Sequence, residues 1–204
     1  MKSKKLTVFL SLACAVIVAA CSCLQAEQQA IAKNLIRLHV VADSDDAEDQ
    51  RRKLLVRDAV LAQTQKLNAE YPDLAPKMIL SENLDSIRLA AEKTLREAGC
   101  ADAVTVRLGK ELFPTRAYDS FSLPAGAYES LRVNIGNAEG HNWWCVVFPS
   151  LCMAATSEEF VQAAKLAGLS DGQIRLITEE DETYVVKFKV LEWIEQLKNL
   201  FWDA

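Results

Sequence analysis

The densest group of chemically versatile side chains lies in the sequence GHNWWCVVFPSLC, which runs from Gly140 to Cys152. It combines one histidine, two tryptophans and two cysteines in 13 residues. Cys145 and Cys152 could form a disulfide, because the proline and serine between them allow the chain to turn. They could also remain structural thiols, or Cys145 could be a thiolate nucleophile with His39 or His141 as its base.

Metal and enzyme signatures are weak in this chain. His141 and Cys145 could bind a metal, but no second close pair of ligands accompanies them, so a structural zinc site is not expected. The sequence contains only two histidines and none of the motifs GxSxG, HExxH, the P-loop or GxGxxG. These features favour a binding or signalling protein without a cofactor over an enzyme.

An acidic turn, Asp43-Ser44-Asp45, follows a β-rich segment that contains His39. The two aspartates suggest a calcium loop, but loop positions 5, 6 and 12 are alanine, glutamate and leucine, which contradicts that motif. We therefore interpret the acidic residues as helix caps that complement the helix dipole. His39 is interpreted as a hydrogen-bonded histidine at a sheet edge, with a site residue as the alternative.

The elements that carry these residues follow from hydrophobic periodicity and capping signals. Strands are expected at 35–41, 104–108, 131–135 and 143–148, and helices at 45–69, 81–98, 156–167, from 170 onwards and at 184–202. Capping boxes are expected at Asp45/Glu48, Thr156/Glu159 and Ser170/Gln173, and a core-facing stripe at Val56, Val60 and Leu67.

The connections between these elements indicate the fold class. Residues 113–123 are expected to form a loop, and residues 136–140 to close a hairpin between the last two strands. The strand at 143–148 is apolar on both faces, which predicts a central position in the sheet. The order of elements predicts an α+β fold: one domain with a mainly antiparallel sheet packed by several helices.

The N-terminus has the features of an export signal. Three lysines precede residues 6–20, which are apolar except for one threonine and one serine. This run of about 15 residues is short for a membrane span. Residues 24–26 (LQA) resemble a signal-peptidase site with cleavage before Glu27, and residues 18–21 (VAAC) resemble a lipobox that would leave Cys21 lipidated. An uncleaved anchor is a third possibility.

We therefore divide the chain into a signal peptide or membrane anchor, residues 1–26, and a secreted globular domain, residues 27–204. The domain carries 20 Lys and Arg against 28 Asp and Glu, a net charge near −8. An acidic domain without a basic cluster is a poor candidate for binding nucleic acid or anionic lipid, so membrane contact is expected only through the N-terminal segment. In an oxidising compartment its three cysteines favour a Cys145–Cys152 disulfide, with Cys100 unpaired.

Two blocks of this sequence resemble the stage II sporulation protein R family. The first is IRLHVVADSDDAEDQ followed by KLLVRDAV, and the second is LPAGAYESLRVNIGNAEGHNWWCVVFPSLC. The resemblance runs from Leu35 to Met153. Asp43 stands where the family pattern has asparagine, and Ser150 where it has proline.

The resemblance implies a noncatalytic signal of endospore formation. Proteins of this family are exported from the forespore into the space between forespore and mother cell. There they activate a membrane-embedded aspartic protease of the mother cell (SpoIIGA-like), which removes the pro-sequence of sigma-E. Two other classes remain open: a secreted cysteine amidase or peptidase acting on the cell wall, and a structural lipoprotein of the envelope.

A protein that activates a protease without catalysis must act through contact, and tryptophan is enriched where contacts contribute most binding energy. We predict that the two segments meet at one edge of the sheet and form the contact surface. Its candidate residues are His39, Asp43, Ser44, Asp45, His141, Asn142, Trp143 and Trp144. Because side chains alternate along a strand, one tryptophan is expected in the core and the other exposed. The alternative is that both tryptophans lie in the core and the acidic residues are only helix caps.

Overall fold

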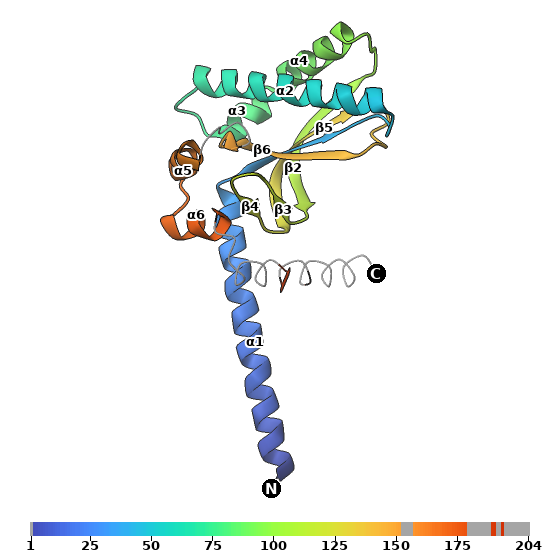
Figure 1. The fold of residues 1–204 in the computed structure, drawn as a ribbon. Coiled ribbons are helices and arrows are strands. Elements are labelled where there is room, and N and C mark those ends of the chain that lie inside the picture. Colours follow the sequence, from blue (N-terminus) through green and yellow to red (C-terminus); the bar gives the residue numbers. More distant parts are fainter. Residues whose placement is uncertain (1, 152–156, 179–188, 191–192, 194–204) are drawn as a thin grey trace.

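The structure is a computed structural model that describes residues 2–151, 157–178, 189–190 and 193 (Figure 1). A long N-terminal helix leads into a four-stranded sheet with helices on both sides. The helices are α1 (Lys2–Lys33), α2 (Ala47–Glu70), α3 (Pro76–Glu82), α4 (Leu84–Glu97), α5 (Ser157–Leu166) and α6 (Asp171–Thr178). The strands are β1 (Ile36–Val41), β2 (Val104–Phe113), β3 (Arg116–Ala117), β4 (Ser122–Leu123), β5 (Gly126–Ile135) and β6 (Asn142–Phe148).

The four-stranded sheet has the order β2-β5-β1-β6. Strand β1 runs parallel to β5 and antiparallel to β6, and β2 runs antiparallel to β5. Strands β3 and β4 form a separate antiparallel pair. The expected α+β class with a mainly antiparallel sheet is therefore confirmed.

The expected hairpin at residues 136–140 is wrong, because β1 lies between β5 and β6. The connection instead crosses the end of β1, where the N–H of Gly140 donates to Ala42 O and that of Glu139 to Asp43 O. The expected central position of β6 is also wrong: β6 is at one end of the four-stranded sheet, and β1, buried along all six residues, is central. Residues 145–147 are buried because side chains cover both faces there, which their hydrophobic pattern cannot distinguish from a central position.

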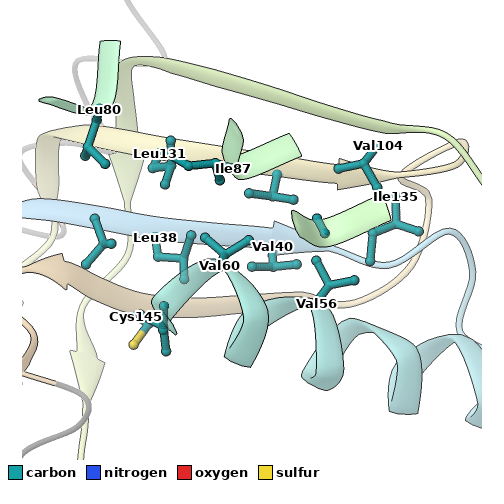
Figure 2. Close-up of a cluster of buried hydrophobic side chains, with 14 of the residues drawn as sticks. Leu38, Val40, Val56, Val60, Leu80, Ile87, Val104, Leu131, Ile135 and Cys145 are labelled. Carbon is teal, nitrogen blue, oxygen red and sulfur yellow. The ribbon is translucent and has the colours of Figure 1, made fainter. Parts of the chain in front are cut away.

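One face of the sheet is covered by α2, α3 and α4, as Figure 1 shows. Its core joins the β1 residues Leu38 and Val40 to residues of α2 and α4, and Figure 2 shows these side chains packed between helices and strands. The expected stripe is confirmed, since Val56, Val60 and Leu67 are all buried. Each such side chain contributes about 1.5–3 kcal/mol when it is fully removed from water.

The opposite face is covered over part of its area by the end of α1, by β3 and β4, and by α5 and α6. Arg37 of β1 is fully buried there, and its guanidinium lies 4.1 Å from the centre of the Phe113 ring. Its Nη2 donates a hydrogen bond of 2.7 Å to the hydroxyl of Tyr118. This contact ties the β3–β4 segment, expected from sequence to be a loop, to the central strand.

The helices after β6 agree with their predicted starts as far as the structure describes them. Ser170 and Gln173 form a reciprocal capping box, in which each backbone N–H donates to the other residue's side chain. Gly168 ends α5 with a positive φ of 88°. Thr156 and most of the helix expected at 184–202 lie outside the described residues.

Helix α1 changes character along its length. Phe9, Leu12, Val16 and Val18 expose large apolar side chains, whereas Gln28 and Ile31 are buried against the sheet domain. Within the part of the chain that the structure describes, no helix is long and apolar enough to cross a membrane.

Candidate interaction surface

The acidic turn at residues 43–45 and the segment that begins at Gly140 meet at one end of the sheet, as expected. They form what we call the tip cluster: Asp43, Ser44, Asp45 and His141. Asp45 Oδ1 accepts the backbone N–H of His141 at 2.6 Å and also contacts the imidazole Nδ1. The side-chain and backbone hydrogen bonds from His141 lower the pKa of Asp45.

Two glycines allow the β5–β6 connection to approach the acidic turn. A Cβ built on Gly140 would lie 2.1 Å from the backbone oxygen of Ser44, and one built on Gly136 would lie 2.1 Å from Asp43 Oδ1. Gly136 also has a positive φ of 54°. Both positions therefore require glycine for the tip cluster to form.

The predicted capping box of Asp45 and Glu48 is wrong. Helix α2 starts after Asp46, whose side chain makes no capping hydrogen bond, and Glu48 pairs with Arg51. The Asp45 carboxylate is drawn away from the helix because the backbone N–H and the ring of His141 both bind it. Ser44 instead provides the side-chain hydrogen bond before the start of α2, since its Oγ accepts the backbone N–H of Asp46 at 3.2 Å.

Lys53 supports the tip cluster from inside α2. Its ammonium donates to the backbone oxygen of His141 at 2.9 Å and to Gln50 Oε1. Gln50 in turn donates to the backbone oxygen of Ser44 at 2.8 Å. Lys53 is almost completely buried, and desolvation lowers its pKa. Sequence reasoning missed Lys53, which lies at the start of the KLLVRDAV block.

His39 lies on the central strand rather than at an edge, and it is 4% exposed. Its Nε2 lies 2.7 Å from Asn142 Oδ1, and its Nδ1 lies 3.3 Å from Glu111 Oε2. Both partners are oxygen acceptors, so the neutral ring donates to one of them at a time and only the protonated ring donates to both. The ring stacks on Trp144 with centroids 3.8 Å apart. The interpretation of His39 as a hydrogen-bonded histidine is confirmed, whereas its edge position is corrected.

Glu111 connects His39 to the outer strands. Its carboxylate accepts Ser130 Oγ–H at 2.6 Å and Arg132 Nη1–H at 2.8 Å. Burial raises the pKa of Glu111, but these hydrogen bonds and the nearby His39 outweigh it, so the pKa is lowered overall. Sequence pattern alone does not reveal this network, because it predicts that β2 ends at residue 108. Lys110 interrupts the apolar alternation of residues 104, 106 and 108, so the local pattern gave no signal that β2 continues to Glu111.

The two tryptophans face opposite sides of β6, and both are half-buried. The expectation of one core and one exposed tryptophan is therefore wrong. Trp143 packs on the helical side, with the Arg57 guanidinium 4.5 Å from its ring centre. Trp144 packs on the other side, between His39 and the guanidinium of Arg116 at 5.8 Å. Their edges line a hollow of about 390 Å³ beside α2.

Cys145 and His39 cannot act together as a catalytic pair. The β1–β6 register pairs Leu38 with Cys145 and His39 with Trp144, so Cys145 shares the helix-covered face with Leu38 and His39 lies on the other face. Cys152 lies outside the described residues, so its disulfide with Cys145 stays a prediction. Cys100 is an unpaired, buried thiol, as expected.

The comparisons with known proteins agree with the two sequence blocks. The sequence model of the family described as stage II sporulation protein R matches residues 32–158. The chain belongs to the stage II sporulation protein R family. Stage II sporulation protein R of Bacillus subtilis (strain 168) is 30% identical over 183 residues, which cover 79% of this chain and 80% of that relative. No solved structure matches the chain significantly.

The matched region runs from the end of α1 to the start of α5 and includes every residue of the tip cluster and of the His39–Glu111 network. Membership in the family identifies the chain as a sporulation protein of stage II. Within the described residues, no group of three or more His, Cys, Asp or Glu side chains is placed to hold a metal ion.

The close approach at Gly140 gives a first prediction. Gly140→Ala should lower the free energy of unfolding by about 1–3 kcal/mol, because the added Cβ collides with a backbone oxygen rather than with a side chain that can move. The matched control is Gly109→Ala on β2, where an added Cβ meets nothing within 4 Å. Urea unfolding of both variants measures the difference, and equal stabilities would contradict the proposed geometry of the tip.

Burial of His39 gives a prediction on pH. Desolvation lowers the pKa of His39 below its ordinary value near 6.5, and this effect outweighs the hydrogen bonds with Asn142 and Glu111 and the charge of Glu111, all of which raise it. The unfolded chain then binds more protons at this residue than the folded chain. Stability from neutral His39 is therefore complete above about pH 6.5 and falls as the pH drops below it.

Urea unfolding of wild type and His39→Gln between pH 5 and 8 isolates this contribution. The difference in unfolding free energy, wild type minus variant, should decrease on acidification. A difference that grows at low pH would show instead that His39 is protonated and bound to Glu111.

Proposed function

We propose that this protein is an exported signal of endospore formation, which activates the sigma-E-processing aspartic protease of the mother-cell membrane from the space between the two cells. The observation that carries the proposal is the family membership, in a chain whose two diagnostic blocks meet at the exposed pair of Asp45 and His141. The domain contributes binding rather than catalysis, and the separation of Cys145 from His39 on opposite faces argues against a cysteine amidase or peptidase that uses this pair.

The contrast between the exposed apolar part of α1 and its packed last turns supports the proposed export. The last turns of α1 pack into the domain, with Gln28 at 7% and Ile31 at 0% exposure, and the exposed apolar part precedes them. Cleavage before Glu27 would therefore remove the exposed part and leave the packed part in place. Lipidation at Cys21 would also preserve the packed turns, so both processing routes are compatible with an intact domain.

The contact surface is proposed to include the tip cluster and the adjacent residues Asn142 and Trp144. The side chains of His141 and Asp45 are 77% and 57% exposed, so a partner can reach both. His39 is too deeply buried to be touched, and we assign it the role of holding Asn142 and Trp144 in position. A Cys145–Cys152 disulfide would fix the other end of β6.

The N-terminus of the exported protein tests the first step. We expect mass spectrometry to find a mature chain that begins at Glu27, because packing against the sheet starts at Gln28. A diacylglyceryl group on Cys21 would assign the lipoprotein route, and a retained Met1 would exclude both. Ala26→Arg is the matched variant, since a bulky charged residue at the cleavage position should block cleavage without touching the buried residues.

Deletion of the gene in a spore-forming host tests the function. We expect pro-sigma-E to accumulate uncleaved, and the wild-type gene to restore processing in an immunoblot time course. Among variants with wild-type secreted levels, Asp45→Ala and His141→Ala should slow processing, because each removes one side of an exposed pair. The control is Lys93→Ala, an exposed lysine on α4. Normal processing in the deletion strain would refute the proposed function.

A further inference from the structure

Two arginines are direct neighbours across β2 and β5. The register pairs Arg107 with Arg132, so their side chains leave the same face of the sheet, the one that carries His39. Like charges placed directly opposite one another destabilise a sheet. Arg132 is compensated by Glu111 at 2.8 Å. For Arg107, which is exposed, no ion pair occurs among the residues that the structure describes.

A hollow of about 300 Å³ lies beside these arginines. It is lined by Arg107, Leu108, Gly109, Lys110, Glu111, Ser130 and Arg132. Gly109 adopts no left-handed conformation, so the backbone does not require glycine here, and a Cβ would meet nothing within 4 Å. Glycine within a strand often marks a place where another group approaches closely. Its absent side chain is what leaves the hollow open.

The charge of this face differs from that of the domain. The exported part carries a net charge near −8. On this side of the sheet, however, the exposed Arg107 and Arg116 accompany Arg132, and the carboxylate of Glu111 is already bound by Arg132 and Ser130. Such a local concentration of positive charge attracts acidic groups and steers their approach.

The face also adjoins the proposed contact surface. Arg116 lies over the Trp144 ring, and Trp144 stacks on His39, whose other neighbour is the exposed Asn142. Arginine beside half-buried tryptophan is the composition found at the centres of protein interfaces. The arginines and the tip cluster therefore lie on connected parts of one side of the molecule.

We propose that the arginine face, defined as Arg107, Gly109, Arg116 and Arg132, binds an acidic segment of the protein partner. A carboxylate of that segment occupies the hollow above Gly109 and pairs with the guanidinium of Arg107, which has no ion pair within the described part of the chain. The identification of the partner as the extracytoplasmic part of the protease rests on the proposed function.

Three variants of the exported protein test the binding site. Arg107→Glu reverses the charge at residue 107, and Gly109→Leu fills the hollow without backbone strain. Arg96→Glu is the matched control, because it makes the same charge change at an exposed position on α4. Secreted level and urea unfolding identify any variant that fails to fold.

The readouts are sigma-E processing and recovery of the protease with the tagged exported protein. We expect Arg107→Glu and Gly109→Leu to lower recovery and processing at least about tenfold, as for the loss of a charge-assisted hydrogen bond, and Arg96→Glu to match wild type. If stably secreted Arg107→Glu and Gly109→Leu both act like wild type, the inference is wrong, although the proposed function stands.

A direct binding assay tests the arginine face independently of the proposed function. If the wild-type gene fails to restore sigma-E processing, that result counts against the proposed function, and the binding assay still decides whether the arginine face binds acidic segments. The probes are fluorescent deca-glutamate and deca-lysine peptides and phosphatidylglycerol vesicles. We expect deca-glutamate to bind wild type, with affinity that falls as salt rises, and to bind Arg107→Glu at least about tenfold more weakly. Absence of deca-glutamate binding, or vesicle binding that depends on Arg107, would overturn the assignment to an acidic protein segment.

Discussion

The position of β1 between β5 and β6 is the constraint on which the rest of the structure depends. It forces the chain from β5 to cross the end of β1 before it can enter β6. That crossing places residues 136–141 on the acidic turn, at a separation that only glycine at positions 136 and 140 permits. The tip cluster is thus a consequence of strand order, and the hydrogen bonds of Asp43 and Asp45 with the crossing chain lock that order in place.

Strand order also divides the chemistry between two faces. On β1, Leu38 and Val40 enter the hydrophobic core beneath α2 and α4, while Arg37 and His39 lie on the other side. A central strand that buries an arginine and a histidine must supply partners for them. Tyr118 serves Arg37, and Asn142 and Glu111 serve His39. These polar contacts join the β3–β4 connection, β6 and β2 to the central strand β1. Hydrogen bonds therefore specify the face that carries Arg37 and His39, whereas hydrophobic packing specifies the face covered by α2 and α4.

The sequence predicted what depends on local pattern and missed what depends on strand neighbours. Periodicity located β1, the Val56 and Val60 stripe and the capping box at Ser170, because each is set within a few residues. It could not place β1 between β5 and β6, since alternation defines the faces of a strand and not its neighbours. The capping role of Asp45 failed for the same reason: its real partner, His141, is 96 residues away. Glu111 and Arg132 were missed because their significance arises only when three strands lie side by side.

Helix α1 contains the N-terminal segment that we propose directs export, and it leads directly into the sheet. Only Asn34 and Leu35 separate the end of α1 from the start of β1, and Leu35 is buried. A lipid on Cys21 would therefore hold the domain within about 20 Å of the membrane, given 1.5 Å per helical residue, and no flexible linker would intervene. Cleavage before Glu27 would free the same domain and keep the packed turns. The processing route thus decides whether the arginine face and the tip cluster meet a partner at a fixed height above the membrane or by free diffusion, while the surface itself stays the same.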